Sequence, residues 1–410
     1  MKNLFFYPHH SGVVCSNSNS TIPVVSFAPK MTGSLANLKS NLHVCTPNPG
    51  NLIHSESPSR IFNCDFNNSS KGNLSALIKK FENINEAASF IDSQYDALIL
   101  SFANDIRVGW QSPDHLLFAE LFYQLNVKIF IFGLGMQDEI SGGLEALTEN
   151  MQEFLKSVKE NAVFVGVRGE STGKWLKQQG IDNCVVLGCP SIFRSPSNIL
   201  SAIKKSRKRA LNNVVTAGYI HSKVRHKPLQ KLLTREDINC SYIFQNDLFS
   251  VFNNEIYNED LNFYNFDTQT VNHDYVSKRL QKIHGNEQPF ERYCYFTNTY
   301  SWFMFNSMSD LFIGDRLHAA ISALLSGVPS ILIYSDLRVK EIADFYSIPS
   351  ISLDMLESYS LEEILMDKFS EEALEKFEKT YKNRLFDFYE ICSRHGLEFI
   401  MDQEIKSLAN

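Results

Sequence analysis

A strand–helix–strand pattern near the end of the chain limits the possible folds more than any other part of the sequence. Residues 310–313 predict a buried strand, residues 315–325 have the apolar spacing of a helix, and residues 328–334 predict a second strand. Gly314 and Gly327 stand at the two changes of direction. Such a pattern with short connections is typical of a parallel sheet covered by helices.

The same alternation of short apolar runs and helical segments recurs along the chain, which predicts the α/β class. Gly180 is placed to end one of the helices. The polar stretch 40–71 predicts irregular loops, and residues 235–289 are too mixed to assign. Further predicted strands are 97–102, 128–132, 163–167, 184–187, 213–219 and 350–353, and further predicted helices are 115–125, 171–179, 338–346 and 370–393.

The length of 410 residues exceeds what one hydrophobic core usually serves. We predict an N-terminal α/β domain over residues 1–197 as the acceptor side, a linker over 198–212, and a C-terminal α/β domain over 213–410 with the anion site. The linker contains a basic cluster, and such a charge run is usually a solvated helix face or linker. The alternative is a docking patch for anionic lipid head groups or a polyanionic acceptor, which would give a peripheral membrane contact. The cluster consists of Lys204, Lys205, Arg207, Lys208 and Arg209.

Composition and charge argue against several classes of protein. A net charge of −7 is opposite to what a nucleic-acid partner requires. The eight cysteines show neither a C-x-x-C motif nor zinc-ligand spacing, which favours free thiols and predicts no metal site. The apolar run after Met1 is too short for a signal peptide, and no stretch reaches the roughly 18 apolar residues of a membrane helix. We therefore expect a cytoplasmic protein, whose oligomeric state the sequence leaves open.

The segment after the predicted strand 310–313 has the features of an anion site. The apolar stripe of the following helix places Asp315 where an N-cap belongs. Arg316 and His318 then lie in the first helical turn, at the carboxyl end of a parallel strand, where open α/β sheets bind ligands. Free backbone N–H groups and the helix dipole add positive potential there. The structural alternative is that Arg316 pairs with a surface carboxylate and His318 is a partly buried histidine with satisfied partners.

Residues 314–349 resemble the C-terminal signature of the polysaccharide pyruvyl transferase family. That signature has a glycine, Arg-Leu-His-Ala, an apolar helix, Gly-Val-Pro, a strand, and Lys-Val before a helix. A second patch, from Val167 to Ser171 and then Gly188-Cys189-Pro190, is similar to the family's Arg-Asp/Glu-x-Ser and Gly-Asp-Pro elements. Two departures are Cys189 in place of an acid and no visible Gly/Asn-Gly-Asp loop in residues 1–41. The signature positions are filled by Gly314, Arg316, Leu317, His318, Gly327, Val328, Pro329, Val339, and Lys340 or Arg338.

The resemblance implies two Rossmann-like domains facing across a cleft, as in the GT-B class of glycosyltransferases. It also implies transfer of the enolpyruvyl group of phosphoenolpyruvate to a sugar of a cell-surface polysaccharide or its precursor, giving a pyruvate ketal. No cofactor is expected beyond this donor, and the partners would be phosphoenolpyruvate and a glycan or lipid-linked acceptor. Arg316 would bind an anionic group, and His318 would contact phosphate or act as general acid. Arg168 would be a second cation that Glu170 orients, although Glu170 could equally be a helix-start carboxylate.

Other signals are less specific. Gly133 and Gly135 lack the third glycine of a dinucleotide fingerprint, so no NAD site is inferred, and a turn that needs small residues is the alternative to a substrate role. Ser335 follows a predicted strand and is taken as a further substrate-binding residue. Cys189 could be a nucleophile, but a buried thiol fits better because no partner histidine is identifiable. Two other functions remain: a nucleotide-sugar glycosyltransferase of the same fold, and an inactive glycan-binding or assembly protein.

Overall fold

The computed structural model describes residues 1–7, 34–35, 38, 48–207, 211–252 and 260–408. The chain forms two compact units, each built on its own sheet. Unit 1 comprises Met1–Val24, His54–Arg194 and Arg384–Asn410, and unit 2 comprises Val25–Ile53 and Ser195–Asn383. Two helices, α2 (Gly50–Glu56) and α17 (Glu371–Arg394), have residues in both units. The protein is therefore of the α/β class, with two Rossmann-like units.

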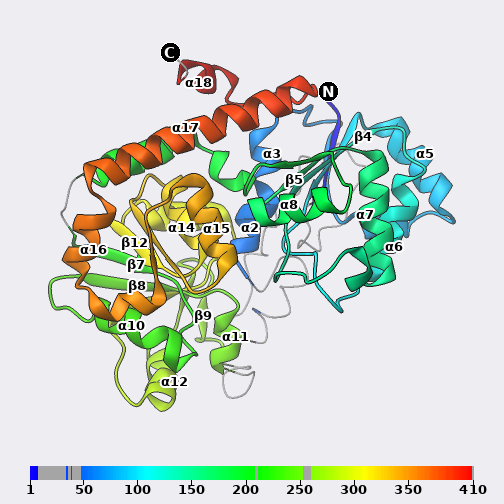
Figure 1. The fold of residues 1–410 in the computed structure, drawn as a ribbon. Coiled ribbons are helices and arrows are strands. Elements are labelled where there is room, and N and C mark those ends of the chain that lie inside the picture. The colour runs from blue at the N-terminus through cyan, green and yellow to red at the C-terminus, as the bar shows by residue number, and fades with distance from the viewer. Residues whose placement is uncertain (8–33, 36–37, 39–47, 208–210, 253–259, 409–410) are drawn as a thin grey trace. The chain divides into compact units, whose positions relative to one another are not determined.

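Unit 1 is built on a parallel sheet of six strands in the order β2-β1-β3-β4-β5-β6. All five residues of β3 are buried, which is typical of a strand covered by helices on both faces. The adjacent helices α6 and α7 pack side by side (Figure 1) and bury Phe118 and Phe154 in the core. The elements are β1 (Leu4–Tyr7), α3 (Pro58–Ile61), β2 (Ser70–Lys71), α4 (Leu74–Ile78), α5 (Ile84–Gln94), β3 (Ala97–Ser101), α6 (Pro113–Phe122), β4 (Lys128–Leu134), η2 (Leu144–Ala146), α7 (Glu149–Asn161), β5 (Ala162–Val167), α8 (Glu170–Gln178), β6 (Cys184–Val186), η3 (Pro190–Phe193) and α18 (Asp402–Ser407).

Unit 2 is built on a mixed sheet of eight strands in the order β14-β13-β12-β7-β8-β11-β10-β9. Only the pairs of β10 are antiparallel among the described strands of this sheet. The elements are α9 (Pro196–Lys205), β7 (Asn213–Thr216), α10 (Lys223–Leu233), β8 (Asn239–Ile243), α11 (Asp247–Phe252), β9 (Tyr264–Asn265), β10 (Thr270–Val271), α12 (His273–His284), β11 (Phe290–Cys294), α13 (Thr299–Asn306), β12 (Leu311–Gly314), α14 (Leu317–Leu325), β13 (Ser330–Tyr334), α15 (Leu337–Tyr346), β14 (Ser350–Ser352), η4 (Leu353–Ser358) and α16 (Leu361–Lys368).

The centre of the unit 2 sheet is a topological switch point. From β7 the chain steps through α10 to β8 on one side, and later from β12 through α14 to β13 on the other. Because such crossovers are almost always right-handed, α10 and α14 cover opposite faces of the sheet. Open α/β sheets bind ligands in the crevice outside the carboxyl ends of two strands that diverge in this way. The ends of β7 and β12 are therefore the place to look for a site in unit 2.

The predicted strand–helix–strand pattern of residues 310–334 is confirmed as β12, α14 and β13. Gly314 ends β12 beside β7, and a Cβ at this position would lie 2.9 Å from the nitrogen of Ala217 and closer still to its carbonyl oxygen. Real Cβ atoms essentially never approach other atoms so closely, so only glycine fits the two strand ends together. Gly180, with φ of 75°, follows α8 as predicted.

Several predictions about organisation differ from the structure. The expected linker 198–212 is largely α9, which packs against α14 within unit 2. The last part of the expected C-terminal domain, from Arg384 onward, belongs to unit 1. The stretch 40–71 was expected to be irregular, but its described part forms α2, α3 and β2. The physical reason is burial: short apolar segments such as Leu52–Ile53 and Ile61–Phe62 become ordered by packing that a local pattern does not show.

Candidate functional site

The predicted anion residues lie at the carboxyl ends of β7 and β12, the switch point of unit 2. Asp315 was predicted to cap α14, and this is wrong: the N-cap position is Arg316, and the helix begins at Leu317. Asp315 instead continues the line of β12, because its N–H donates to the carbonyl oxygen of Ala217 at 3.0 Å. No side chain accepts a hydrogen bond at the start of α14 in the described structure. The first turn of this nine-residue helix therefore keeps its positive potential.

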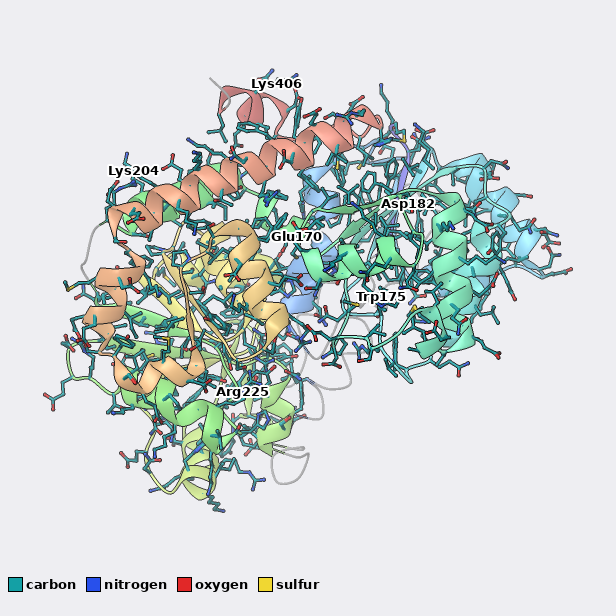
Figure 2. All side chains as sticks on the ribbon, viewed as in Figure 1. Glu170, Trp175, Asp182, Lys204, Arg225 and Lys406 are labelled. Carbon is teal, nitrogen blue, oxygen red and sulfur yellow. The ribbon has the colours of Figure 1, made fainter. Side chains whose placement is uncertain are left out.

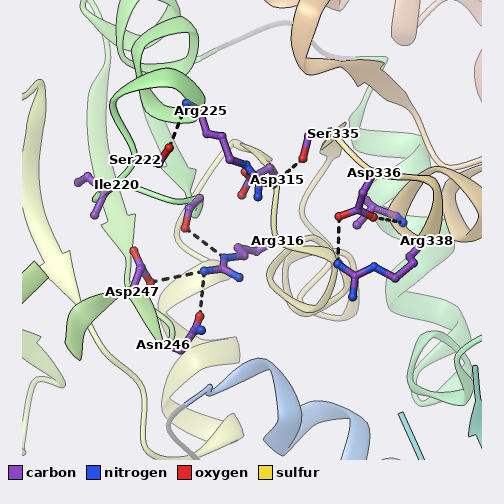
Figure 3. A network of polar contacts seen from close by, with 12 residues as sticks. Ile220, Ser222, Arg225, Asn246, Asp247, Asp315, Arg316, Ser335, Asp336 and Arg338 are labelled. Carbon is purple, nitrogen blue, oxygen red and sulfur yellow. Dashed lines mark hydrogen bonds and ion pairs between the residues drawn. The ribbon is translucent and has the colours of Figure 1, made fainter. Parts of the chain in front are cut away.

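Arg316 is buried and held by neutral partners (Figure 3). Its Nε donates to the carbonyl oxygen of Gly218 at 3.1 Å, and one terminal nitrogen donates to Oδ1 of Asn246 at 2.9 Å. The same nitrogen lies 4.0 Å from Oδ1 of Asp247, a fully buried carboxylate. The alternative that Arg316 pairs with a surface carboxylate is therefore wrong. Its other terminal nitrogen, Nη1, has no hydrogen-bond partner among the described residues.

Arg225 is a second cation at this edge and was not predicted from the sequence. It lies in the first turn of α10 (Figure 2), whose N-cap is Ser222, and its side chain points toward Asp315 and Ser335 (Figure 3). Its Nη2 contacts Oδ2 of Asp315 at 3.2 Å and donates to Oγ of Ser335. Its Nε is buried without a hydrogen-bond partner in the described structure, and no partner is found there for its Nη1.

The two guanidinium groups share one aromatic ring. The Cζ atoms of Arg225 and Arg316 each lie 3.6 Å from the ring centroid of Tyr219. Two guanidinium groups fit at this distance only on opposite faces of the ring, so the tyrosine separates two like charges while attracting both through its π faces. We call Arg225, Tyr219 and Arg316 the arginine–tyrosine cluster. It offers two open cationic donors on rigid supports, which is suited to a ligand with more than one anionic oxygen.

A buried hydrogen-bond network holds the loop that carries Tyr219. The hydroxyl oxygen of Tyr242 accepts from the N–H groups of Gly218 and Ile220 at 3.1 and 3.2 Å, and the hydroxyl donates to Oδ2 of Asp247 at 2.7 Å. Burial raises the pKa of Tyr242 well above its usual value, with a further contribution from Asp247. Tyr242 therefore stays neutral and keeps its role as a donor to Asp247. No sequence signal pointed to this network, because Tyr242 and Asp247 come from β8 and α11 in the unassigned segment.

The buried carboxyl group of Asp315 is electrostatically unusual. Burial raises its pKa to about 7, while Arg316 and Arg225 act in the opposite direction and Asp247 and Asp336 add to the rise. Its Oδ1 atom is buried and has no hydrogen-bond partner in the described structure. A carboxyl group in this state is a candidate for a functional role, since strongly shifted acids cluster at functional sites.

His318 lies two residues after Arg316, in the first turn of α14, and is partly buried. The start of α2 packs against it: a Cβ on Gly50 would lie 3.0 Å from Cβ of His318 and 3.1 Å from Oε1 of Gln245. Gln245 is itself buried, and its side-chain nitrogen has no hydrogen-bond partner in the described part of the chain. The backbone of α2 at Gly50 therefore approaches His318 closely, a contact that sequence spacing does not reveal.

The predicted residues of the first half lie together at the carboxyl edge of the unit 1 sheet. Arg168 follows β5, is buried, and donates from Nη1 to Oδ1 of Asn104 at 3.3 Å. A Cβ on Gly135 would lie 3.4 Å from Cδ of Arg168. Glu170 is the exposed first residue of α8, and no hydrogen bond or ion pair joins it to Arg168 in the described structure. Asn104 contacts Arg168 and was not predicted from the sequence.

Gly133 has a structural requirement of its own. Its φ is 74°, and a Cβ there would lie 2.8 Å from both the ring of His54 and the carbonyl oxygen of Phe102. Nε2 of His54 donates to that carbonyl oxygen, which leaves Nδ1 as an acceptor, 3.7 Å from Sγ of Cys189. Cys189 is fully buried and also lies 2.9 Å from Oγ of Ser191. The predicted buried thiol is confirmed, and its histidine neighbour was missed because it lies far away in sequence.

The remaining predictions have mixed outcomes. Arg207 of the basic cluster pairs with Glu371 at 2.9 Å, whereas Lys208 and Arg209 lie outside the described residues. The six described cysteines do not form disulfides. In the described ranges, none of the helices combines the length and the apolar character needed to span a bilayer.

Two α/β units with polar residues gathered at the carboxyl ends of parallel strands define a general class of ligand-binding proteins. Within this class, the model of the polysaccharide pyruvyl transferase family matches residues 33–336, and the chain belongs to that family. No protein with a curated description matches the sequence significantly.

Solved structures with similar folds have low sequence identity to this chain. One is HepE from Anabaena in complex with UDP-glucose, which is 12% identical with a TM-score of 0.44 and alignment over 100% of this chain and 98% of that one. Another is a UDP-GlcNAc 2-epimerase from Neisseria meningitidis bound to UDP-GlcNAc, which is 10% identical with a TM-score of 0.42 and alignment over 84% and 88% of the two chains.

Proposed function

We propose that this chain transfers the pyruvyl group of phosphoenolpyruvate to a sugar of a cell-surface polysaccharide or its precursor. The products are a pyruvate ketal on two sugar hydroxyls and inorganic phosphate. The observation that carries the proposal is the pair of open guanidinium donors on Tyr219, one of which belongs to Arg316, two residues before His318, in a chain that belongs to the pyruvyl transferase family. Phosphoenolpyruvate has a phosphate and a carboxylate, so it offers one anionic group to each arginine.

In the proposed reaction, His318 protonates the methylene carbon of phosphoenolpyruvate, which makes the adjacent carbon electrophilic. One sugar hydroxyl adds to that carbon, and its proton returns to His318. The second hydroxyl then replaces phosphate on the same carbon, and its proton leaves with the phosphate. Arg316 and Arg225 hold the anionic groups while charge shifts toward the phosphate, which is the kind of stabilisation that preorganised donors provide.

The proposed roles of the unit 1 residues concern substrate positioning. Arg168 and its partner Asn104 supply a fixed cation and an amide at the sheet edge, and Gly133 and Gly135 let the backbone turn tightly there. Glu170 has no hydrogen bond or ion pair with Arg168 in the described structure, so its proposed role reduces to a favourable charge at the start of α8.

In unit 2, Ser335 acts through Arg225, to which it is hydrogen-bonded. Gly314 and Leu317 shape the strand end and the first helical turn.

Thermal unfolding with candidate donors tests the proposal. A ligand that binds only the folded protein raises its stability, by about 2.7 kcal/mol at a hundredfold excess over Kd. We expect phosphoenolpyruvate to raise Tm and a panel of nucleotide sugars to leave it unchanged. A rise with a nucleotide sugar alone would instead indicate a glycosyltransferase. No rise with either donor would indicate a glycan-binding protein without this activity.

A further inference from the structure

The arginine–tyrosine cluster is balanced by two buried carboxyl groups. Arg225 lies against Asp315 at 3.2 Å, and Arg316 lies 4.0 Å from Asp247. When all four groups are ionised, their charges cancel. A ligand with two negative charges that binds to both arginines would leave an excess of buried negative charge. Such an excess is costly in a protein interior, and ionisable groups usually relieve it by a change of protonation.

The two carboxyl groups differ in how well they are held as anions. Asp247 accepts from the Tyr242 hydroxyl and from the N–H of Gln245, each at 2.7 Å, so both of its oxygens have a donor. Asp315 has only Arg225 on Oδ2, and its Oδ1 is buried without a hydrogen-bond partner in the described structure. Hydrogen bonds to the charged form favour it, so Asp315 is the acid that gives up its charge first.

The charged groups that face Asp315 also indicate that Asp315 is the acid that is protonated first. Arg225 approaches it from α10, Arg316 from its own chain segment, Asp247 from α11 and Asp336 from the start of α15. Two of these groups are cations that a bound anion would neutralise, and the other two are acids that already oppose ionisation of Asp315. Tyr242, which also interacts with Asp315, is neutral. Neutralising the two arginines therefore removes the positive charge that stabilises the ionised form of Asp315.

We propose that Asp315 takes up a proton when a ligand with at least two negative charges binds to Arg225 and Arg316, and that this frees Arg225 from its ion pair for the ligand. Phosphoenolpyruvate as the ligand rests on the proposed function, but the proton uptake requires only an anion of this charge. In the free protein the pKa of Asp315 is already about 7. The bound anion raises this pKa further, so the ligand binds more tightly as the pH falls.

The pH range of proton uptake follows from the pKa of Asp315 in the free protein and its rise in the complex. Above about pH 7 the free protein has Asp315 ionised and the complex has it protonated, so close to one proton enters with each ligand. Well below pH 7 Asp315 is protonated in both states and uptake disappears. The linkage predicts that affinity falls by up to about tenfold for each pH unit above 7, until the pKa of the complex is reached.

Isothermal calorimetry at pH 8 measures this proton directly. The apparent enthalpy of phosphoenolpyruvate binding is compared in two buffers of different ionisation enthalpy, for the native chain, Asp315→Asn, and the control Asp344→Asn. Asp344 is an exposed acid of α15 that pairs with Lys340. We expect an uptake of close to one proton in the native chain and the control, and its loss in Asp315→Asn. The same uptake in all three proteins would overturn the proposal, because the proton would then go to the ligand or another group.

A carbon-13 spectrum of carboxyl-labelled aspartates in the native chain gives a second measurement that needs no variant. Sulfate serves as a dianion that does not itself titrate near neutral pH, alongside phosphoenolpyruvate. We expect one carboxyl signal to move to the protonated position with either anion. If sulfate shifts it and phosphoenolpyruvate does not bind, the proton uptake holds and the proposed donor is wrong. If phosphoenolpyruvate binds and no carboxyl becomes protonated, the donor holds and the uptake is wrong. If neither anion binds, both are wrong.

Discussion

The carboxyl edges of the two sheets place an arginine at a strand end in different ways. In unit 2, Arg316 and Arg225 stack on one tyrosine and lie against buried carboxyl groups. In unit 1, Arg168 contacts the amide of Asn104 and packs beside Gly135. The first edge is organised by charge, and the second by close backbone approach. We propose that anion recognition belongs mainly to unit 2, and the following predictions test this difference between the two sheets.

Replacing His318 with alanine should have the largest effect, because it removes the proposed proton donor at the charged edge. We expect kcat to fall by about two to four orders of magnitude while much of the affinity for phosphoenolpyruvate remains. The control is His273→Ala, an exposed histidine at the start of α12. Steady-state kinetics and calorimetry separate the two effects. A loss of affinity without a loss of kcat would make His318 a phosphate ligand only.

Arg316→Lys should weaken donor binding by about 1.5–3 kcal/mol, the scale of a hydrogen bond to a charged group. Lysine keeps the positive charge but loses the planar fork and the stacking on Tyr219, so KM should rise more than kcat falls. Arg225→Lys should act in the same direction, and Arg292→Lys on the exposed part of β11 is the matched control. If Arg168→Lys alone changes donor affinity, the assignment of anion recognition to unit 2 fails.

Alanine at the two close-approach glycines tests how each edge is built. Gly314→Ala and Gly133→Ala should each lower the free energy of unfolding by about 1–3 kcal/mol, because the new Cβ overlaps backbone atoms that cannot move away. Gly133→Ala also places alanine at a positive φ, which adds to its cost. Gly285→Ala is a control that shares the positive φ but has open space around it. Chemical denaturation measures all three, and equal losses at Gly133 and Gly285 would show that packing at the sheet edge is irrelevant.

The smallest effect is expected at the basic cluster. Lys204 and Lys205 end α9, and Arg207 already pairs with Glu371. Reversing the two lysine charges should leave both activity on a soluble acceptor and binding to anionic vesicles unchanged. Vesicle sedimentation at low and high salt checks this. A salt-sensitive loss of vesicle binding would establish the alternative, a membrane-docking patch.

Sequence patterns correctly predicted those strands, helices and helix ends that depend on neighbouring residues alone. The strand–helix–strand unit at Gly314 and the helix stop at Gly180 could be predicted, because apolar period and glycine position determine them directly. The predicted cap at Asp315 failed because a tertiary contact, the hydrogen bond from its N–H to the carbonyl oxygen of Ala217 just after β7, holds Asp315 in line with β12. The prediction of irregular loops for residues 40–71 failed for a similar reason. Burial in the fold, and not local propensity, orders the short helices in the described part, residues 48–71.

Only part of the candidate site could be predicted, again because sequence patterns do not show tertiary contacts. Arg316 and His318 lie two residues apart and belong to one sequence motif, so they could be found. Arg225 and Tyr219 come from the other strand of the switch point, and His54 meets Cys189 across a long stretch of chain. Such pairs are defined by strand order, which a single sequence does not give. A signal did exist for Arg225, because it lies in the first turn of the helix after the predicted strand 213–219.

Detection of the product tests the proposed pyruvyl transfer directly. Purified protein is incubated with carbon-13-labelled phosphoenolpyruvate and a panel of glycan acceptors, and the products are analysed by mass spectrometry. We expect a labelled pyruvate ketal on one acceptor, one phosphate released per ketal, and loss of both products in His318→Ala. A labelled product that forms equally well in His318→Ala, or phosphate release with no label on any acceptor, would contradict it.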